Sequence, residues 1–120
     1  RPNRIRKSVG AENTFAEDLT DLDEAVARLA PIIAKVVKRC GEKDVAGRTV
    51  TLKIKFADFE QITRRMTLSA AIRDPATIMA VARELLVGEF PFRKGIRLLG
   101  VSMSGFEVRD SQDEAQLELF

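Results

Sequence analysis

The stretch 49-TVTLKIKF-56 alternates strictly between polar and apolar side chains. Apolar residues occupy its even positions from Val50 to Phe56, and threonines and lysines occupy its odd positions. Successive side chains of a β-strand point to opposite faces of a sheet. This spacing therefore predicts a strand with one buried face and one solvated, cationic face.

Three further strands are predicted by similar patterns on either side of this one. Residues 61–72 alternate again, although Arg64 interrupts their apolar phase. Residues 8–15 also alternate, and residues 95–106 form a last strand. The apolar phase of this last strand changes at residues 98–99, which predicts a β-bulge there.

Apolar residues at intervals of three and four predict a long helix between the first two strands. Thr20 is the expected start of this helix, and Gly41 is its expected end. Pro31 lies inside the helix and lacks a backbone N–H, so we expect its face to be solvated. Cys40 lies on the apolar stripe and is the only cysteine, which indicates a buried, unreactive thiol.

A second helix is predicted after Asp74-Pro75, which combine a capping carboxylate with a first-turn proline, and it ends at Gly88. The elements then follow the order strand, helix, strand, strand, helix, strand. This order is typical of the α+β split βαβ, or ferredoxin-like, unit. Two helices can cover only one face of its four-stranded antiparallel or mixed sheet, so we expect the other face to stay open.

The charged residues divide the chain into three parts: a basic arm at 1–7, a folded domain at 8–106 and a flexible acidic tail at 107–120. The tail holds five of the 18 acidic residues and one of the 20 basic residues, which leaves a net charge of +6 on the remainder. A basic body points to a polyanionic partner, although many proteins carry this charge without binding one. The chain does not begin with methionine, so we expect a piece of a longer protein.

The composition excludes several classes of function. Histidine is absent, which removes the commonest general base and the commonest metal ligand. We therefore expect no catalytic residue, no metal site and no small-molecule substrate in this chain. A single cysteine suits a reducing compartment, and neither a membrane-spanning apolar run nor a signal peptide is present. These features predict a cytoplasmic protein that does not enter a membrane.

The outward phases of the strands are rich in side chains that bind phosphate. Lysine and arginine neutralise phosphate charge, and serine and threonine hydroxyls donate to phosphate oxygens without reading a base. The face lacks aromatic residues, and its alternative interpretation is a solvated cationic surface without a ligand. The phase of Arg97 is left open by the expected bulge. The residues expected on the open face are Thr14, Lys53, Lys55, Thr63, Arg65, Thr67, Ser102 and Ser104.

The last five residues, 116-QLELF-120, place two leucines and a phenylalanine on the acidic tail. They resemble the peptide by which bacterial DNA polymerases and repair proteins dock on the ring-shaped sliding clamp, the polymerase III beta subunit. The resemblance implies that Gln116 hydrogen-bonds backbone at the edge of a pocket, while Leu117, Leu119 and Phe120 fill an apolar cleft. The alternative is a strand that returns to its own core.

The body of the chain resembles the little-finger domain of Y-family DNA polymerases, of the bacterial DNA polymerase IV type. The similarity extends over residues 4–106 and is specific in the order and spacing of its motifs. Its last strand departs from the family pattern, since Leu98 and Ser102 are neutral where family members often carry further basic residues. The motifs are 6-RKSVG-10 with Glu12 and 14-TF-15, 53-KIKFADF-59, 63-TRRMT-67 and 96-IRLLGV-101.

The resemblance implies a domain that binds duplex, primer-template DNA in translesion synthesis and DNA repair, without a cofactor of its own. Nucleotide transfer and its magnesium ions would belong to a palm domain outside this chain. The arm resembles the linker that joins thumb to little finger. The residues implied to contact DNA are Arg4, Arg6, Lys7, Ser8, Gly10, Thr14, Thr63, Arg64, Arg65, Thr67, Arg97 and Ser102, beside the open-face residues Lys53, Lys55 and Ser104.

Two other classes of function fit the predicted topology. A ferredoxin-like RNA-binding module would need aromatic platforms on its open sheet. A small acyl-phosphate hydrolase would need a phosphate-binding arginine loop and an asparagine that orients water. Asn3 and Asn13 are the only asparagines, and neither lies in a glycine-rich loop.

Overall fold

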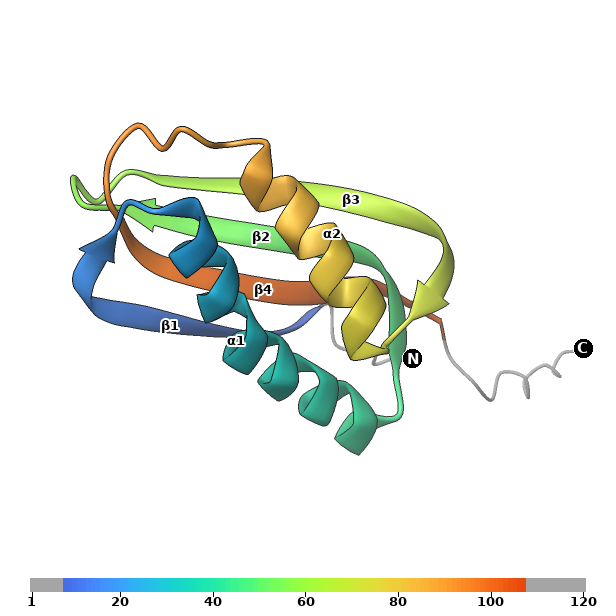
Figure 1. Cartoon of the computed structure of the whole chain (residues 1–120). Coiled ribbons are helices and arrows are strands. Elements are labelled where there is room, and N and C mark those ends of the chain that lie inside the picture. The colour runs from blue at the N-terminus through green and yellow to red at the C-terminus, as the bar shows by residue number, and fades with distance from the viewer. Residues whose placement is uncertain (1–7, 108–120) are drawn as a thin grey trace, which may run out of the picture.

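The computed structural model describes residues 8–107 of the chain. It confirms the predicted order of strands and helices (Figure 1). The elements are β1 (Ser8–Leu19), α1 (Leu22–Lys43), β2 (Ala46–Phe56), β3 (Gln61–Ile72), α2 (Pro75–Val87) and β4 (Ile96–Glu107).

The four strands form one antiparallel sheet in the order β1-β4-β2-β3. Strands β1 and β2 run in the same direction with β4 between them, and strands β3 and β4 do so with β2 between them. Each βαβ crossover therefore skips one strand, as the split βαβ arrangement requires. The predicted fold class is confirmed, and the sheet is wholly antiparallel rather than mixed.

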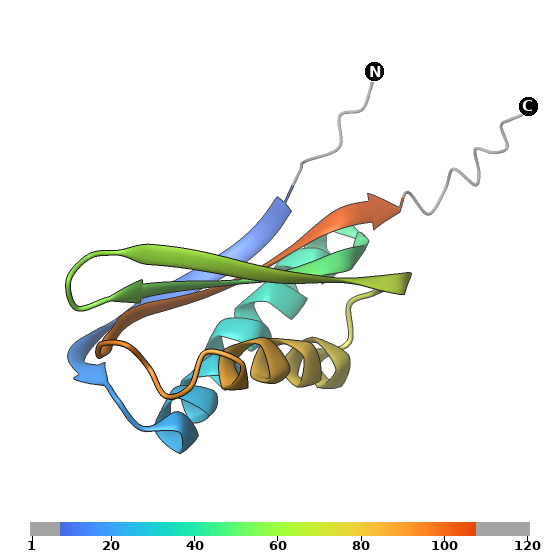
Figure 2. The same cartoon turned by 90° about the horizontal axis from the view of Figure 1, so that it is seen from above.

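Both helices lie on one face of the sheet, and no described element covers the opposite face (Figure 2). Helix α1 packs on β1 and β4, while α2 packs on β2 and β3. Leu29 of α1, Ile78 of α2 and Leu99 of β4 are fully buried in the layer between the helices and the sheet. Complete burial of one such side chain stabilises the fold by about 1.5–3 kcal/mol relative to its exposed state.

The ends of α1 differ from their predicted positions. Asp21, rather than Thr20, is the N-cap, because its carboxylate accepts a hydrogen bond from the Glu24 backbone N–H at 3.0 Å. The helix continues past Gly41, since Asp44 adopts the left-handed conformation and its N–H reaches back to the carbonyls of the last turn. Pro31 lies on the exposed face of the helix, as expected.

Helix α2 begins and ends as predicted. The Asp74 carboxylate accepts hydrogen bonds from the Thr77 backbone N–H at 2.9 Å and from the Thr77 hydroxyl at 2.7 Å. Pro75 occupies the first turn, and Gly88 is the C-cap. The Thr77 hydroxyl bond comes first among the causes that hold the pKa of Asp74 below its ordinary value, and the Thr77 backbone bond comes second.

Two strands differ in detail from their predicted form. The bulge of β4 lies at Arg97, one residue before the predicted site, because Lys55 pairs with Leu98 while Phe56 pairs with Ile96. Strand β1 also extends to Leu19, four residues beyond its predicted end.

Within residues 8–107, no helix combines the length and apolar character needed to cross a membrane.

Candidate nucleic-acid interface

The open face presents four rows of residues that run across all four strands. Directly paired residues of antiparallel strands point to the same face, so each row is read from the strand register. All eight residues predicted for this face lie in these rows, together with Ser8 and Gly10. In the order β1, β4, β2, β3, the rows are Ser8–Ser104–Thr49–Thr67, Gly10–Ser102–Thr51–Arg65, Glu12–Gly100–Lys53–Thr63 and Thr14–Leu98–Lys55–Gln61.

Hydroxyl groups dominate the first of these rows. The hydroxyl oxygens of Thr49 and Thr67 lie 2.9 Å apart and form a hydrogen bond across β2 and β3. Thr49 is 9% exposed, whereas Thr67 is exposed at the edge of the sheet. The bond therefore fixes the orientation of a hydroxyl that remains accessible to a ligand.

Arg64 lies on the opposite side of β3 from the predicted face. It pairs in register with Leu52, whose side chain is buried beneath the helices. Its Nε donates to Glu89 Oε2 at 2.9 Å, so a neighbouring carboxylate neutralises it. The resemblance included Arg64 among the DNA-contacting residues, but the alternation of the strand separates it from Arg65, which lies on the open face.

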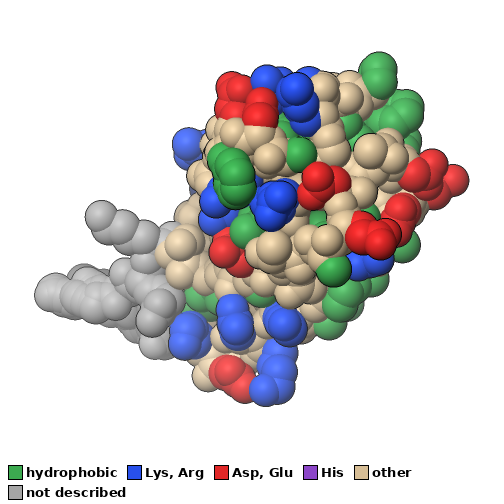
Figure 3. Space-filling view, turned by 90° about the vertical axis from the view of Figure 1, so that its left-hand side faces the viewer, with side chains coloured by type: hydrophobic (Ala, Val, Ile, Leu, Met, Phe, Trp, Pro, Cys, Tyr) green, Lys and Arg blue, Asp and Glu red, His purple; other side chains and the backbone are tan. Residues whose placement is uncertain are grey.

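The end of the sheet that carries the β2–β3 turn has charges of both signs, as Figure 3 shows. Arg93 Nη2 lies 2.9 Å from Glu60 Oε1 and 3.4 Å from Asp58 Oδ2. The backbone N–H of Glu60 is the main cause that holds the pKa of Asp58 below its ordinary value, and Arg93 adds to it. These contacts stabilise the turn. Arg93 is therefore less available to a ligand than a cation of the open face that has no carboxylate partner.

Arg97 belongs to this end of the sheet. Its guanidinium carbon lies 4.9 Å from the centroid of the Phe59 ring, and its Nε is buried without a hydrogen-bond partner among the described residues. Phe59 is 66% exposed in the β2–β3 turn. The bulge thus directs Arg97 toward the turn, at one end of the face rather than within its four rows.

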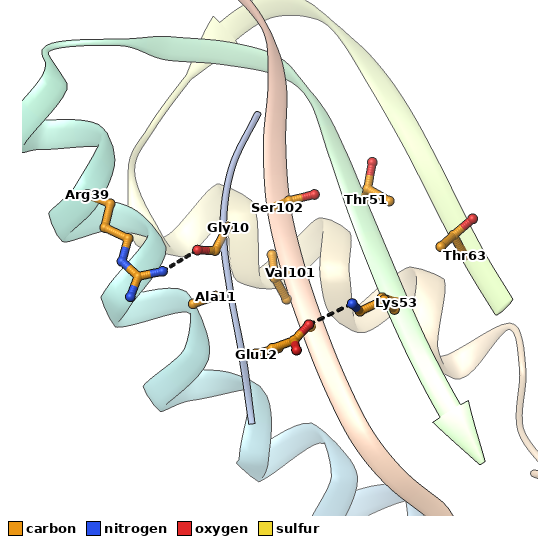
Figure 4. A pocket seen from close by; sticks show the side chains of 10 residues that line it. Gly10, Ala11, Glu12, Arg39, Thr51, Lys53, Thr63, Val101 and Ser102 are labelled. Carbon is orange, nitrogen blue, oxygen red and sulfur yellow. Dashed lines mark hydrogen bonds and ion pairs between the residues drawn. The ribbon is translucent and has the colours of Figure 1, made fainter. Parts of the chain in front are cut away.

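A hollow of about 450 Å³ lies on the open face and is lined by residues of all four strands and of α1 (Figure 4). Gly10 and Gly100 contribute no side chains there, and the backbones of β1 and β4 approach closely. A Cβ added to Gly10 would lie 2.8 Å from Ser102 Cβ, closer than real Cβ atoms come to such a neighbour, and 3.0 Å from the Val101 carbonyl oxygen, which is tighter than most such contacts. The other residues that line the hollow are Ala11, Glu12, Arg39, Thr51, Lys53, Thr63, Val101 and Ser102.

Two charged residues that line the hollow were absent from the predicted contact set. Glu12 lies on the open face, and its Oε1 is 2.6 Å from Lys53 Nζ. Arg39 extends from α1 to the edge of β1, where its guanidinium donates to the Gly10 carbonyl oxygen (Figure 4). The outward phase of Glu12 is readable from the sequence, but its partner becomes evident only once β4 is known to separate β1 from β2.

The cations of the four rows differ in their partners. Lys53 is paired with Glu12, whereas Lys55 and Arg65 form no ion pair with another described residue. Arg65 is exposed and Lys55 is partly exposed. Two cations are therefore available to a polyanion, and a third is available if its carboxylate partner is displaced.

The described residues contain no group of three or more Asp, Glu or Cys side chains placed to hold a metal ion. Cys40 is buried in the core, and burial raises the pKa of its thiol while the Arg73 charge lowers it. The thiol is buried, as predicted. The predicted contacts Arg4, Arg6, Lys7, Gln116, Leu117, Leu119 and Phe120 lie outside the described residues.

Residues 6–119 match the model of the impB/mucB/samB family C-terminal domain. DNA polymerase IV 2 of Agrobacterium fabrum is 45% identical over 120 residues, which cover 99% of this chain and 34% of that protein. DNA polymerase IV 3 of Mesorhizobium japonicum is 51% identical over 116 residues, which cover 97% of this chain and 32% of that protein. The chain thus spans about a third of the length of these curated relatives.

Two solved structures show the same architecture. The little-finger domain of a polymerase IV, in a complex with the beta-clamp processivity factor, matches with a TM-score of 0.69 and 26% identity, covering 84% of this chain and 90% of that one. A chimeric Y-family DNA polymerase matches with a TM-score of 0.79 and 18% identity, covering 89% of this chain and 30% of that one. The chain therefore belongs to the impB/mucB/samB family as its C-terminal domain, and it has the fold of the Y-family little finger.

Proposed function

We propose that this domain holds duplex DNA for a bacterial translesion polymerase of the DNA polymerase IV type. The observation that carries the proposal is the open sheet face, where Lys55 and Arg65 lie unpaired beside rows of hydroxyl groups. Such groups bind the sugar-phosphate backbone and carry little sequence preference. The catalytic domains of the longer protein would perform nucleotide transfer with magnesium, in the cytoplasm where bacterial DNA is found.

The four rows also favour duplex DNA over single-stranded RNA as the ligand. None of their residues is aromatic, and sheets that recognise single strands stack bases on aromatic side chains.

If about five phosphates are bound by the face and arm together, log affinity should fall with log salt at a slope of roughly −4 to −5.

The DNA proposal can be tested by removing the two unpaired cations. The double variant Lys55→Ala/Arg65→Ala should reduce the steepness of the salt slope by about 2, because each neutralised phosphate contributes about 0.9. The control Lys35→Ala/Arg83→Ala removes the same charge from exposed positions on the helices. Fluorescence anisotropy with a labelled duplex measures both. Equal slopes for the two variants would remove the open face from the DNA interface.

We also propose that the tail docks the polymerase on the sliding clamp through Gln116–Phe120. The support is the 116-QLELF-120 pattern and the domain-level similarity to a little finger that was solved in a beta-clamp complex. Burial of three apolar side chains contributes about 5–8 kcal/mol before the cost of ordering the peptide. A micromolar Kd corresponds to about 8 kcal/mol, the upper end of this range, so we expect micromolar or weaker affinity, which suits a reversible tether.

Deletion of residues 116–120 should abolish binding to a bacterial sliding clamp in surface plasmon resonance while DNA affinity persists. Leu119→Ala/Phe120→Ala should reproduce the loss, because these two side chains supply most of the apolar area. The control Gln112→Ala/Glu114→Ala lies in the same tail but outside the pattern. Unchanged clamp affinity after the deletion would refute the docking proposal.

A further inference from the structure

The ion pair between Glu12 and Lys53 joins strands that are not neighbours. Glu12 lies on β1 and Lys53 on β2, and both pair in register with Gly100 of β4. Two strand spacings of about 4.8 Å separate the backbones of β1 and β2 at this row. The side chains nevertheless meet, with Glu12 Oε1 at 2.6 Å from Lys53 Nζ.

Gly100 makes this contact geometrically available. A Cβ at position 100 would lie 3.2 Å from Glu12 Cβ and 3.6 Å from Glu12 Oε1, in the space that the Glu12 side chain crosses. Any larger side chain between the two strands would stand between the charges. The absence of a side chain at Gly100 therefore leaves room for the ion pair. Figure 4 shows the pair between Glu12 and Lys53.

The ion pair lies among groups that suit phosphate. Thr63 pairs in register with Lys53 on the other side, and Thr51 and Ser102 follow in the next row. Glu12 and Lys53 are only partly covered, with side chains 50% and 34% exposed, so a ligand can reach them. A carboxylate oxygen on a lysine ammonium takes the place that a phosphate oxygen would take on the same group.

We propose that Glu12 is an affinity-limiting residue that competes with DNA phosphate for Lys53. This inference rests on the proposed DNA-binding function. In the free domain Glu12 neutralises Lys53, and a phosphate that approaches the ammonium must compete with this carboxylate for its charge. Lys53 then contributes less to affinity than Lys55 or Arg65.

The test is titration of a labelled 20-base-pair duplex with the full 120-residue chain at several salt concentrations. Glu12→Gln should bind about three- to tenfold more tightly at low salt, and its salt slope should be steeper by about 1, because one more cation is released to phosphate. The control Glu84→Gln removes the same charge from an exposed site on α2 and should change affinity less than twofold.

A third comparison separates release of Lys53 from general charge repulsion. In a Lys53→Met background, Glu12→Gln should change DNA affinity less than twofold, because no ammonium remains to be released. A gain that persists in this background would overturn the competition, since Glu12 would then act on DNA by repulsion alone.

The remaining outcomes distinguish this inference from the proposed function. Unchanged or weaker binding by Glu12→Gln, with normal binding by the parent, would overturn the role of Glu12 and leave the DNA proposal standing. Failure of both the parent and Glu12→Gln to bind the duplex would overturn the proposed function and this inference with it.

Discussion

The guanidinium of Arg97 stacks on the ring of Phe59 at a distance of 4.9 Å from the ring centroid. Arg97 forms the bulge of β4, and Phe59 has a φ of 69° in the β2–β3 turn. Two irregular backbone positions thus meet through their side chains. A contact of this kind contributes about 0.5–1 kcal/mol at an exposed site, which helps to offset the left-handed backbone of Phe59.

Substitution of Phe59 separates the ring contact from the backbone cost. Phe59→Ala should lower the free energy of unfolding by about 1 kcal/mol, because it removes the ring and keeps a Cβ at positive φ. Phe59→Gly should lower it less, since glycine adopts this conformation without strain. Urea unfolding measures both variants. A stabilised Phe59→Ala would show that the ring contributes nothing.

Arg64 and Arg65 are adjacent in sequence and lie on opposite faces of β3. Arg65→Ala should weaken duplex binding about three- to tenfold and lower the steepness of the salt slope by about 1. Arg64→Ala should leave affinity within twofold, because Glu89 already neutralises that guanidinium. Anisotropy titrations across salt measure both. A larger loss of DNA affinity for Arg64→Ala than for Arg65→Ala would contradict binding of DNA to the open face.

Asp74 should make the stability of α2 depend on pH in the acidic range. Because hydrogen bonds from Thr77 depress its pKa in the folded state, the carboxylate stabilises the fold above the ordinary value of 3.8. This stabilisation is lost as the pH falls below 3.8 toward the depressed folded pKa. Urea unfolding between pH 6 and pH 2.5 should show the free energies of unfolding of the parent and Asp74→Asn converging as the Asp74 carboxylate is protonated. A constant difference would show that the cap does not titrate.

Gly10 is required by close approach of the β1 and β4 backbones. Gly10→Ala should lower the free energy of unfolding by about 1–3 kcal/mol, because its Cβ would lie 3.0 Å from the Val101 carbonyl oxygen and 2.8 Å from Ser102 Cβ. Gly41→Ala provides the control, since a Cβ there meets no atom within 4 Å and alanine favours a helix. The midpoint temperature of thermal unfolding should therefore fall for Gly10→Ala and rise for Gly41→Ala.

The sequence was sufficient for the parts of the fold that local patterns determine. Alternation from Val50 to Phe56 located β2 and its faces, and Asp74-Pro75 located the start of α2. The start of α1 was displaced by one residue because Thr20 and Asp21 are both competent caps, and only the hydrogen bond to Glu24 distinguishes them. The last residues of β1 were missed because Ala16, Glu17 and Asp18 interrupt the alternation before the buried Leu19.

The sequence predicted which residues lie on the open face better than it predicted which of them form ion pairs. The phases of the strands placed Lys53, Lys55 and Arg65 on one face without knowledge of strand order. The Glu12–Lys53 contact could not be predicted, because it requires β4 between β1 and β2 and a residue without a side chain at position 100. The helix-side location of Arg64 follows from its phase in β3, although the family resemblance had placed it among the DNA contacts.

The place of β4 in the sheet has a consequence for biosynthesis. Among the described residues, β4 is the only strand that pairs with β1, and it follows all the other described elements in the chain. The nascent chain therefore carries β1 and one side of β2 as unpaired edges until β4 has emerged from the ribosome. Pairings between such distant segments form slowly, and unpaired edges can associate with other chains. A pause in translation that holds β4 inside the ribosome should for this reason promote aggregation more than a pause placed after β4 has emerged.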